Sequence, residues 1–297
     1  MLEDADRVRM TAMCHDADGI PKVLGAGVVT TRADGTRVQL MHNGIAVVAD
    51  GYCGPWMTEL ITQCRGHHEP QEELVFHAVE RHLPMDATML ELGGYWAYYS
   101  LWFLKGSPGR RAIVLEPDPA HRALGERNAA LNSLCPEFVA GFAAAAEGGA
   151  ELFATESSGT IAVPRRSVPG LLDEHSIRFL DLLHCDAQGA ELSVLESCLP
   201  LIREQRIGWC VVSTHAHQIT GDPLTHQRCL ALLERAGARV VAEHDVHESF
   251  SGDGLIVARV GSLPADWVPP ALTYNRYSTS FFRNPAYDLA VALKRID

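Results

Sequence analysis

Short apolar runs separated by turn residues mark the first part of the chain. Residues 38–41 and 45–48 are two such runs, and Asn43-Gly44 lies between them. An Asn-Gly pair between apolar runs is a strong signal for a β-hairpin. We therefore expect residues 1–66 to form a β-rich N-terminal extension that caps the rest of the chain.

From residue 67 to 261, helical and strand-like patterns alternate, an order typical of βαβ units around a mostly parallel sheet. The last two strand-like runs, 239–245 and 254–260, have no helix between them and must therefore pair antiparallel. The other strands are expected at 88–92, 112–116, 179–185 and 207–213, with one more inside the run 137–146. Helices are expected at 70–83, 118–131, 190–199 and 222–237.

This order of elements predicts the fold class: an α/β, Rossmann-like sheet, mostly parallel with a terminal antiparallel strand. The sheet of dinucleotide dehydrogenases stays parallel, whereas the predicted order matches that of class I S-adenosylmethionine methyltransferases. Residues 262–297 contain several prolines and aromatic side chains. We expect them to form a C-terminal tail that packs on the core or on an acceptor site.

Composition narrows the class of partner. The 297 residues carry a formal net charge of −12, which argues against nucleic acid or an anionic membrane as the partner. The eight cysteines include no Cys-x-x-Cys pair, so a zinc ribbon or a thioredoxin-type dithiol is not expected. The acidic N-terminus lacks the apolar segment of a signal peptide, and no apolar run approaches the roughly 18–20 residues of a membrane helix. We expect a soluble, cytoplasmic protein.

Acids and histidines follow the predicted strands at the edge where ligands bind in open α/β sheets. Glu91 precedes the turn Gly93-Gly94, and Glu116 ends the next strand, 25 residues after Glu91. Glycines let a backbone pass close to a ligand, and an acid in the second position can accept hydrogen bonds from two ribose hydroxyls. Together they predict a nucleotide cofactor. The alternative is that the glycines merely close a tight turn and Glu116 is a solvated strand end.

At this point the chain resembles the FkbM family of methyltransferases. The resemblance covers roughly residues 38–260, and the joint order of its motifs is more specific than any one of them. The motifs are Met89-Leu90-Glu91-Leu92-Gly93 with Tyr98-Tyr99-Ser100, then Leu115-Glu116-Pro117-Asp118-Pro119, then Asp186-Ala187-Gln188-Gly189-Ala190-Glu191. The resemblance implies a Rossmann-like enzyme that uses S-adenosylmethionine, usually to O-methylate a natural product, a sugar or a lipid-linked glycan.

The resemblance also implies a cofactor site. It suggests that Glu91 and Gly93 approach the methionine and ribose part of S-adenosylmethionine, that Glu116 binds the ribose hydroxyls, and that Asp186 faces the reactive sulfonium. The complete set of cofactor-binding candidates is Glu91, Gly93, Gly94, Tyr95, Ser100, Glu116, Asp118, Ala143, Ala144, Asp186 and Gln188, in which the two alanines would border the adenine.

Methyl transfer to a hydroxyl needs a group that removes the hydroxyl proton. Histidine has the best-matched pKa for this task, so His215, after the fifth strand, is the first candidate, followed by His217 and Asp186. The alternative is that His215 only holds the edge together by hydrogen bonds. A divalent metal such as Mg²⁺, held by Asp186 with His215 or Asp253, is a separate hypothesis. Gln188 stands where a glutamate is more usual, which weakens any metal site that needs an anion there.

The run His67-His68-Glu69-Pro70-Gln71-Glu72-Glu73 is similar to a feature of one branch of the family. Its acids favour a helix N-terminus electrostatically, its position before the first strand could cover the cofactor, and metal ligation is a further alternative. Our candidates for an acceptor site or lid are His67, His68, Glu69, Glu248, Tyr274 and Tyr277.

The sequence thus predicts an S-adenosylmethionine-dependent methyltransferase that acts on a hydroxyl of a small-molecule acceptor. One alternative is an NAD-dependent oxidoreductase with the same glycine turn. The antiparallel ending and the lack of a full Gly-x-Gly-x-x-Gly count against it. The other is a non-catalytic nucleotide-binding module. Burying so many polar side chains at one edge without a task would be costly, which counts against that module.

Overall fold

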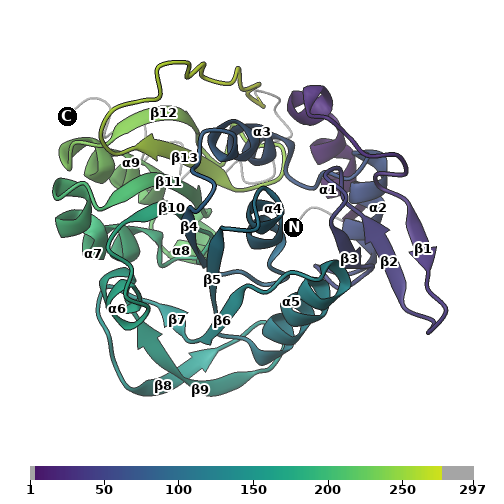
Figure 1. Cartoon of the computed structure of the whole chain (residues 1–297), viewed down its shortest axis with the longest axis horizontal. Helices are drawn as coiled ribbons and strands as arrows, with labels where there is room; N and C mark the ends of the chain where they lie inside the picture. The colour runs from purple at the N-terminus through teal and green to yellow at the C-terminus, as the bar shows by residue number, and fades with distance from the viewer. Residues whose placement is uncertain (1–3, 276–297) are drawn as a thin grey trace.

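The structure is a computed structural model that describes residues 4–275. Its centre is a seven-stranded sheet in the order β12-β13-β11-β10-β4-β5-β6 (Figure 1). Neighbouring strands from β11 to β6 run parallel, and β13 pairs antiparallel with both β11 and β12. The strands are β4 (Thr88–Leu92), β5 (Arg111–Glu116), β6 (Glu137–Ala140), β10 (Leu180–Cys185), β11 (Ile207–Thr214), β12 (Arg239–His244) and β13 (Gly254–Arg259).

Helices cover both faces of this sheet. One hydrophobic cluster joins it to α3, α4 and α5 through side chains such as Phe76, Leu101 and Leu124. A second cluster joins the opposite face to α6, α7 and α9 through Leu171, Leu195 and others. These helices are α3 (Pro70–Glu80), α4 (Tyr98–Lys105), α5 (Pro119–Asn132), α6 (Val168–Glu174), α7 (Glu191–Arg203) and α9 (Thr225–Arg235), with the short α8 (His217–Thr220) before α9. The layered α/β class and the antiparallel ending are confirmed.

The N-terminal residues form a small sheet beside α5 (Figure 1). Strands β1 (Val29–Thr31), β2 (Arg37–Leu40) and β3 (Ala46–Val48) are antiparallel, and the predicted hairpin is present with Val38 opposite Val48. Asn132 both donates to and accepts from the backbone of Ala46 (2.7 and 2.8 Å), which ties β3 to α5. The β-rich description was incomplete, because this part also contains α1 (Asp4–Ala12), a 3₁₀ turn (Asp16–Gly19) and α2 (Pro55–Gln63).

The third predicted strand is present and occupies the first part of the run expected to contain it. The run 137–146 ends as β6 at Ala140, and after Gly141, whose φ of 154° bends the chain, it continues as β7 (Phe142–Ala143) in another sheet. There β7 pairs with β9 (Thr160–Arg166), which forms an unpredicted hairpin with β8 (Ala150–Ala154). In the chain, this hairpin lies between β6 and β10 of the central sheet.

The parts of the chain after β13 have no regular element up to Asn275. Thr273 donates its N–H to Asp16 (2.9 Å), and the amide of Asn275 donates to the carbonyl of Ser249 (2.9 Å), so this segment packs on the described fold. Tyr277, one of the predicted acceptor-site residues, lies outside the described residues. None of the helices in residues 4–275 is long and apolar enough to cross a membrane.

Candidate active site

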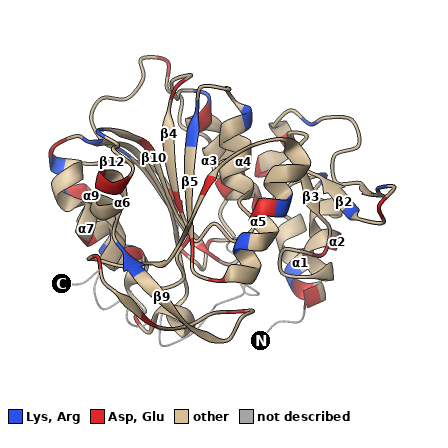
Figure 2. Cartoon of the chain, turned by 60° about the horizontal axis from the view of Figure 1, so that its bottom comes forward, with Lys and Arg blue, Asp and Glu red and all other residues tan. Residues whose placement is uncertain are grey.

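The carboxyl ends of the parallel strands bring the predicted acids together. Figure 2 shows acidic residues at the lower ends of the central strands, away from the basic residue that begins β5. Glu91 and Glu116 lie on the adjacent strands β4 and β5, and Asp186 and His215 directly follow β10 and β11. The topology therefore gathers on one edge residues that are far apart in the sequence.

The glycine turn after β4 is tight enough to require its glycines. Gly93 has a φ of +80°, and a Cβ at this position would lie 1.8 Å from the carbonyl oxygen of Asp186. A Cβ at Gly94 would lie 2.1 Å from the side chain of Val114. Tyr95 and Ala97 also have positive φ angles, 40° and 61°. Residues other than glycine rarely adopt this left-handed backbone conformation. The turn thus holds β4 against the end of β10 and places backbone at the sheet edge.

Glu91 is buried directly below this turn. Its carboxylate accepts the backbone N–H of Ser100 in α4 (3.2 Å). Burial raises the pKa of Glu91 to about 7, although His184 and Ser100 act in the opposite direction. Both the backbone N–H and the side chain of Ser100 act on this carboxylate, so Ser100 holds Glu91 in place at the start of α4.

Glu116 organises the loops on both sides of it. One carboxylate oxygen accepts the N–H of Tyr95 (3.0 Å) and the other accepts the N–H of Asp118 (2.8 Å). The ring of Tyr95 stacks on His121 with centroids 3.4 Å apart. A carboxylate has about four acceptor positions, so each oxygen of Glu116 keeps capacity for a ribose hydroxyl.

Asp118 is occupied by the protein itself. It accepts the N–H of Ala120 (2.9 Å) and so caps α5. It also accepts the N–H groups of Ser157 (2.7 Å) and Ser158 (3.1 Å) and the hydroxyl of Ser158, at the tip of the β8–β9 hairpin. The two predicted adenine neighbours lie near this hairpin, since Ala143 belongs to β7 and Ala144 donates its N–H to Arg166 of β9 (2.9 Å).

His215 lies between three carboxylates. Its Nδ1 donates to Glu191, the first residue of α7, which also accepts the N–H of Gly189 (3.0 Å). Its Nε2 lies 3.1 Å from Asp186 and 3.7 Å from Asp253. Burial lowers the pKa of His215, but these carboxylates outweigh it and raise the pKa well above the usual range. The imidazole is therefore held in one orientation with Nε2 toward two acids whose side chains are each 30% exposed.

The other predicted residues near His215 are placed differently. His217 begins α8 and is half-buried, and Gln188 is exposed in the turn before α7. Glu248 offers its carbonyl to Gln71 (3.1 Å) in the loop before β13, and Tyr274 is 39% exposed. The structure gathers Glu91, Glu116, Asp186, His215 and Asp253 at one edge. Gln188 is exposed in the turn that follows Asp186, and Tyr274 lies in the segment after β13.

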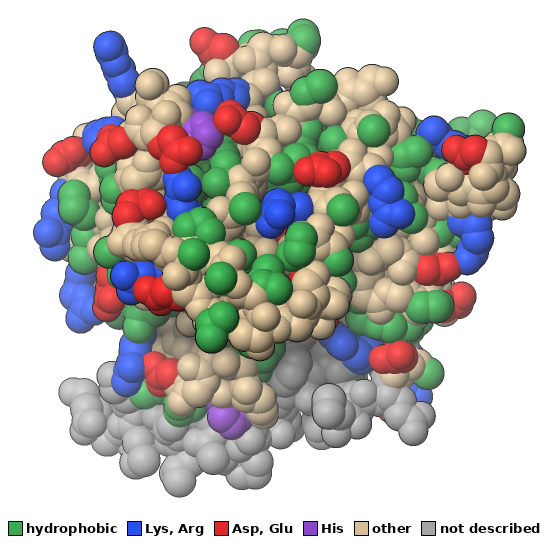
Figure 3. Space-filling view, turned by 90° about the horizontal axis from the view of Figure 1, so that it is seen from below, with side chains coloured by type: hydrophobic (Ala, Val, Ile, Leu, Met, Phe, Trp, Pro, Cys, Tyr) green, Lys and Arg blue, Asp and Glu red, His purple; other side chains and the backbone are tan. Residues whose placement is uncertain are grey.

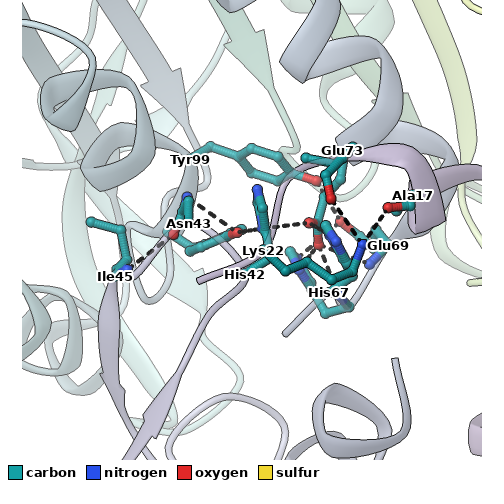
Figure 4. Close-up of polar contacts among 12 residues, drawn as sticks. Ala17, Lys22, His42, Asn43, Ile45, His67, Glu69, Glu73 and Tyr99 are labelled. Carbon is teal, nitrogen blue, oxygen red and sulfur yellow. Dashed lines mark hydrogen bonds and ion pairs between the residues drawn. The ribbon is translucent and has the colours of Figure 1, made fainter. Parts of the chain in front are cut away.

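The histidines of the 67–73 run are buried inside the fold (Figure 4). Glu73 has no exposed side-chain surface and accepts hydrogen bonds from Nδ1 of His67, Nδ1 of His68 (2.7 Å) and the N–H groups of His68 (2.8 Å) and Glu69 (3.3 Å). Burial raises the pKa of Glu73, but the two histidines outweigh it and lower the pKa well below the usual range. Glu73 thus fastens the N-terminal turn of α3.

Removing this carboxylate should destabilise the protein. We expect Glu73→Ala to lower the free energy of unfolding by about 3–5 kcal/mol, because it leaves two buried imidazoles without their common partner. Urea denaturation followed by fluorescence measures the loss. Glu59→Ala, at an exposed position of α2, is the control and should change stability by less than about 0.5 kcal/mol. Equal stability of both variants would contradict the role of Glu73.

Potential metal-ligand atoms lie close together in this buried cluster rather than at the predicted site. Within residues 4–275, three ligand atoms that all lie within 4.8 Å of one another are found at His42, His67 and Glu73. The rings of His42 and His67 stack with centroids 4.1 Å apart and planes 19° apart. Stacked rings cannot both point a nitrogen lone pair at one ion, so this cluster is a hydrogen-bonded network. In the same part of the chain, the ligand atoms of Asp186, His215 and Asp253 are not all within 4.8 Å of one another.

Sequence reasoning missed three residues that build the site. Glu191 orients His215, and its position inside the Asp186–Glu191 motif was the available signal. Gln71 donates to the carbonyls of Glu248 (3.1 Å) and Thr273 (2.7 Å) and accepts the N–H of Phe250 (2.9 Å), which holds the loop before Asp253. Tyr52, from the N-terminal extension, stacks on Trp96 beside the glycine turn (4.4 Å). No local pattern indicates these last two contacts.

The strand order, with one antiparallel strand next to the edge, is that of the Rossmann-like class I methyltransferases. The model of the FkbM methyltransferase domain matches residues 84–240, more than half of the chain. The chain therefore belongs to the FkbM methyltransferase family, and the expected resemblance is confirmed.

Solved structures of methyltransferases are similar to the chain at low sequence identity. A precorrin-6y C5,15-methyltransferase from Geobacter metallireducens is 15% identical, with 64% of this chain and 88% of that one covered and a TM-score of 0.43. An O-methyltransferase from Bacillus cereus, in complex with SAH, is 18% identical, with 64% and 80% covered and a TM-score of 0.43. No curated protein matches the sequence.

Proposed function

We propose that the protein transfers the methyl group of S-adenosylmethionine to a hydroxyl of a natural product, a sugar or a glycan. One observation carries the proposal. The glycine turn after β4 meets the end of β10 at Asp186, and Glu116 and His215 lie on the same edge of the sheet. Cofactor-binding and proton-accepting groups therefore share one edge, as methyl transfer to a hydroxyl requires.

The residues present suit S-adenosylmethionine. Glu116 has acceptor capacity left for the ribose hydroxyls, and the Gly93-Gly94 turn allows backbone to approach the ligand. Asp186 and the buried Glu91 supply negative charge for a cofactor that carries an ammonium and a sulfonium. The wider set of candidates is Tyr95, Ser100, Asp118 (through the loop it caps), Ala143, Ala144 and Gln188. When bound, the cofactor supplies an electrophilic methyl group on a good leaving group.

The protein's part in the reaction is to orient the acceptor and to take its proton. Holding an oxygen in line with the methyl group can provide much of the acceleration. His215 is the proposed base, because Glu191 fixes the ring and Nε2 faces the exposed sides of Asp186 and Asp253. His217 and Asp186 are the next candidates. The N-terminal extension (1–66) and the described part of the tail (262–275), with Glu69, Glu248 and Tyr274, would border the acceptor. His67 and His68 are buried partners of Glu73, so they are not among the acceptor contacts that we propose.

Calorimetric titration with S-adenosylhomocysteine, and with NAD for comparison, tests the proposal. We expect micromolar binding of S-adenosylhomocysteine alone, after which hydroxylated acceptors can be screened. Binding of NAD alone would favour an oxidoreductase instead. Binding of neither would favour a non-catalytic module.

We expect the reaction to proceed without a divalent metal. The donor atoms of Asp186, His215 and Asp253 are not gathered as a metal requires, and Gln188 supplies no further anion. Turnover on a screened acceptor should be unchanged after treatment with EDTA and after addition of Mg²⁺. Loss of activity with EDTA that Mg²⁺ restores would contradict this prediction and show that the reaction needs a divalent metal.

The proposed acceptor is a small molecule rather than a nucleic acid or a membrane. The net charge of −12 provides no positive field for phosphates. On the face seen in Figure 3, basic and acidic side chains are interspersed, without a continuous basic patch. This mixture is typical of an enzyme surface that does not hold a phosphate backbone.

A further inference from the structure

The run His67–Glu73 lies outside the matched methyltransferase domain, which begins at residue 84. It contains three glutamates at the N-terminal end of α3. In two of them, both carboxylate oxygens accept hydrogen bonds from other residues of the fold. Glu73 binds His67 and His68, as described above. Glu72 accepts hydrogen bonds from Nε2 of His184 (2.8 Å) and from the hydroxyl of Ser213 (2.6 Å), which ties α3 to β10 and β11.

Glu69 differs from the other two. Its side chain is 13% exposed, against none for Glu73. One oxygen lies 3.2 Å from Nε2 of His68 and accepts the hydroxyl of Tyr99 (3.2 Å). Tyr99 belongs to the first turn of α4, directly after the glycine turn (Figure 4). Glu69 is therefore held next to the segment that would carry the methionine part of the cofactor, with acceptor capacity to spare.

The surroundings of Glu69 have an excess of negative charge. Burial raises the pKa of Glu69, and the nearby Glu72 and Asp186 raise it further, against the opposing effect of His68. Asp253 is raised to a pKa of about 7 by burial and by the same group of acids, including Glu69. The cationic partners of these acids within the described part of the chain are two histidines with raised pKa values, His68 beside Glu69 and His215 beside Asp186 and Asp253, so the carboxylates outnumber them. Such a group of carboxylates suits a cationic ligand group.

We infer that Glu69 supplies the charge that recognises the sulfonium of S-adenosylmethionine, so that the site distinguishes the charged cofactor from its neutral product, S-adenosylhomocysteine. The two ligands differ by one methyl group and one positive charge. A carboxylate in a partly buried site favours the charged form, because low effective dielectric strengthens the attraction. The inference rests on the proposed cofactor and gives the run 67–73 a role in product release.

The test compares the affinities of three ligands for the full-length protein by calorimetry: S-adenosylmethionine, S-adenosylhomocysteine and sinefungin, which carries a protonated amine in place of the methylated sulfonium. In Glu69→Gln, we expect binding of the two charged ligands to weaken at least about tenfold, and that of S-adenosylhomocysteine to change less than about twofold. Glu69→Asp should restore part of the preference for the charged ligands.

Two variants serve as controls. Tyr99→Phe removes the hydroxyl that holds Glu69 but keeps its charge, so it should leave the ratio of the affinities nearly unchanged. Glu59→Gln makes the same charge change at an exposed position of α2 and should alter neither affinity. Melting temperatures show whether each variant is folded.

Equal weakening of all three ligands in folded Glu69→Gln, or no weakening of any, would overturn the assignment while leaving the proposed function intact. A shift in the ratio in folded Glu59→Gln as large as that in Glu69→Gln would also overturn it, since the effect would then not be specific to Glu69. Wild-type protein that binds none of the three ligands would overturn the proposed function itself.

Discussion

Glu116→Ala should weaken the binding of S-adenosylhomocysteine at least about hundredfold. Hydrogen bonds to a charged group contribute roughly 1.5–3 kcal/mol each, and the proposed contact has two of them, to the ribose hydroxyls. Their loss amounts to about 3 kcal/mol or more, which is about two orders of magnitude in affinity. Alanine also releases the N–H groups of Tyr95 and Asp118, which Glu116 accepts in the fold. Calorimetric titration of the purified variant measures the effect.

Two further variants separate ligand contact from loop organisation. Glu116→Gln keeps one oxygen for backbone N–H groups but loses the charge, so its affinity should fall between those of wild type and Glu116→Ala. Glu126→Ala, at an exposed position of α5, should bind as wild type does. A folded Glu116→Ala protein with wild-type affinity would contradict the assignment of Glu116 to the ribose.

The central sheet could be predicted because its strands are buried on both faces. The predicted bounds of β4 are those of the structure, and β5 and β10 differ by one residue. Such strands appear as continuous apolar runs, and the polar residues that end them stand out. Glu91, Glu116 and Asp186 were found in this way. Because parallel strands end at one edge, their positions in the sequence were sufficient to place them together.

Short elements outside the central sheet were missed. The β8–β9 hairpin has only the brief apolar runs 152–154 and 161–163, and four of the five residues of β8 are exposed, so no buried strand stood out there. Helix α2 begins at Pro55, whose fixed φ suits a first helical position. The helix is short, and the glycines on both sides of it made the segment resemble a series of turns. In both places the structure depends on contacts with distant segments, such as those of Asp118 with Ser157 and Ser158.

The different partners of Glu69, Glu72 and Glu73 could not be predicted from the sequence. There the three residues looked alike, and all of them could favour a helix N-terminus. Glu72 finds its partners at Ser213 and His184, more than a hundred residues away, while Glu73 finds its partners within the run itself. Only these contacts distinguish Glu69 as the acid that accepts the hydroxyl of Tyr99 in α4.

His215→Ala should lower turnover at least about tenfold while changing the affinity for S-adenosylhomocysteine less than about twofold. Removal of a general base costs typically 10²–10⁴-fold in rate, whereas Nε2 of His215 faces Asp186 and Asp253 rather than the ribose end of the site. Steady-state kinetics on a screened hydroxylated acceptor, with calorimetry for the cofactor, separate the two quantities.

The pH dependence of turnover tests the assignment of His215 as the base independently. A base acts in its deprotonated form, and the neighbouring carboxylates raise the pKa of His215 well above the usual range. Turnover of the wild type should therefore rise with pH through and above neutrality, and this rise should be absent in His215→Ala. His217→Ala is the matched control, and it should keep both the rate and the profile. Full activity of His215→Ala would remove this residue from the mechanism, and loss of activity in His217→Ala alone would transfer the role of the base to His217.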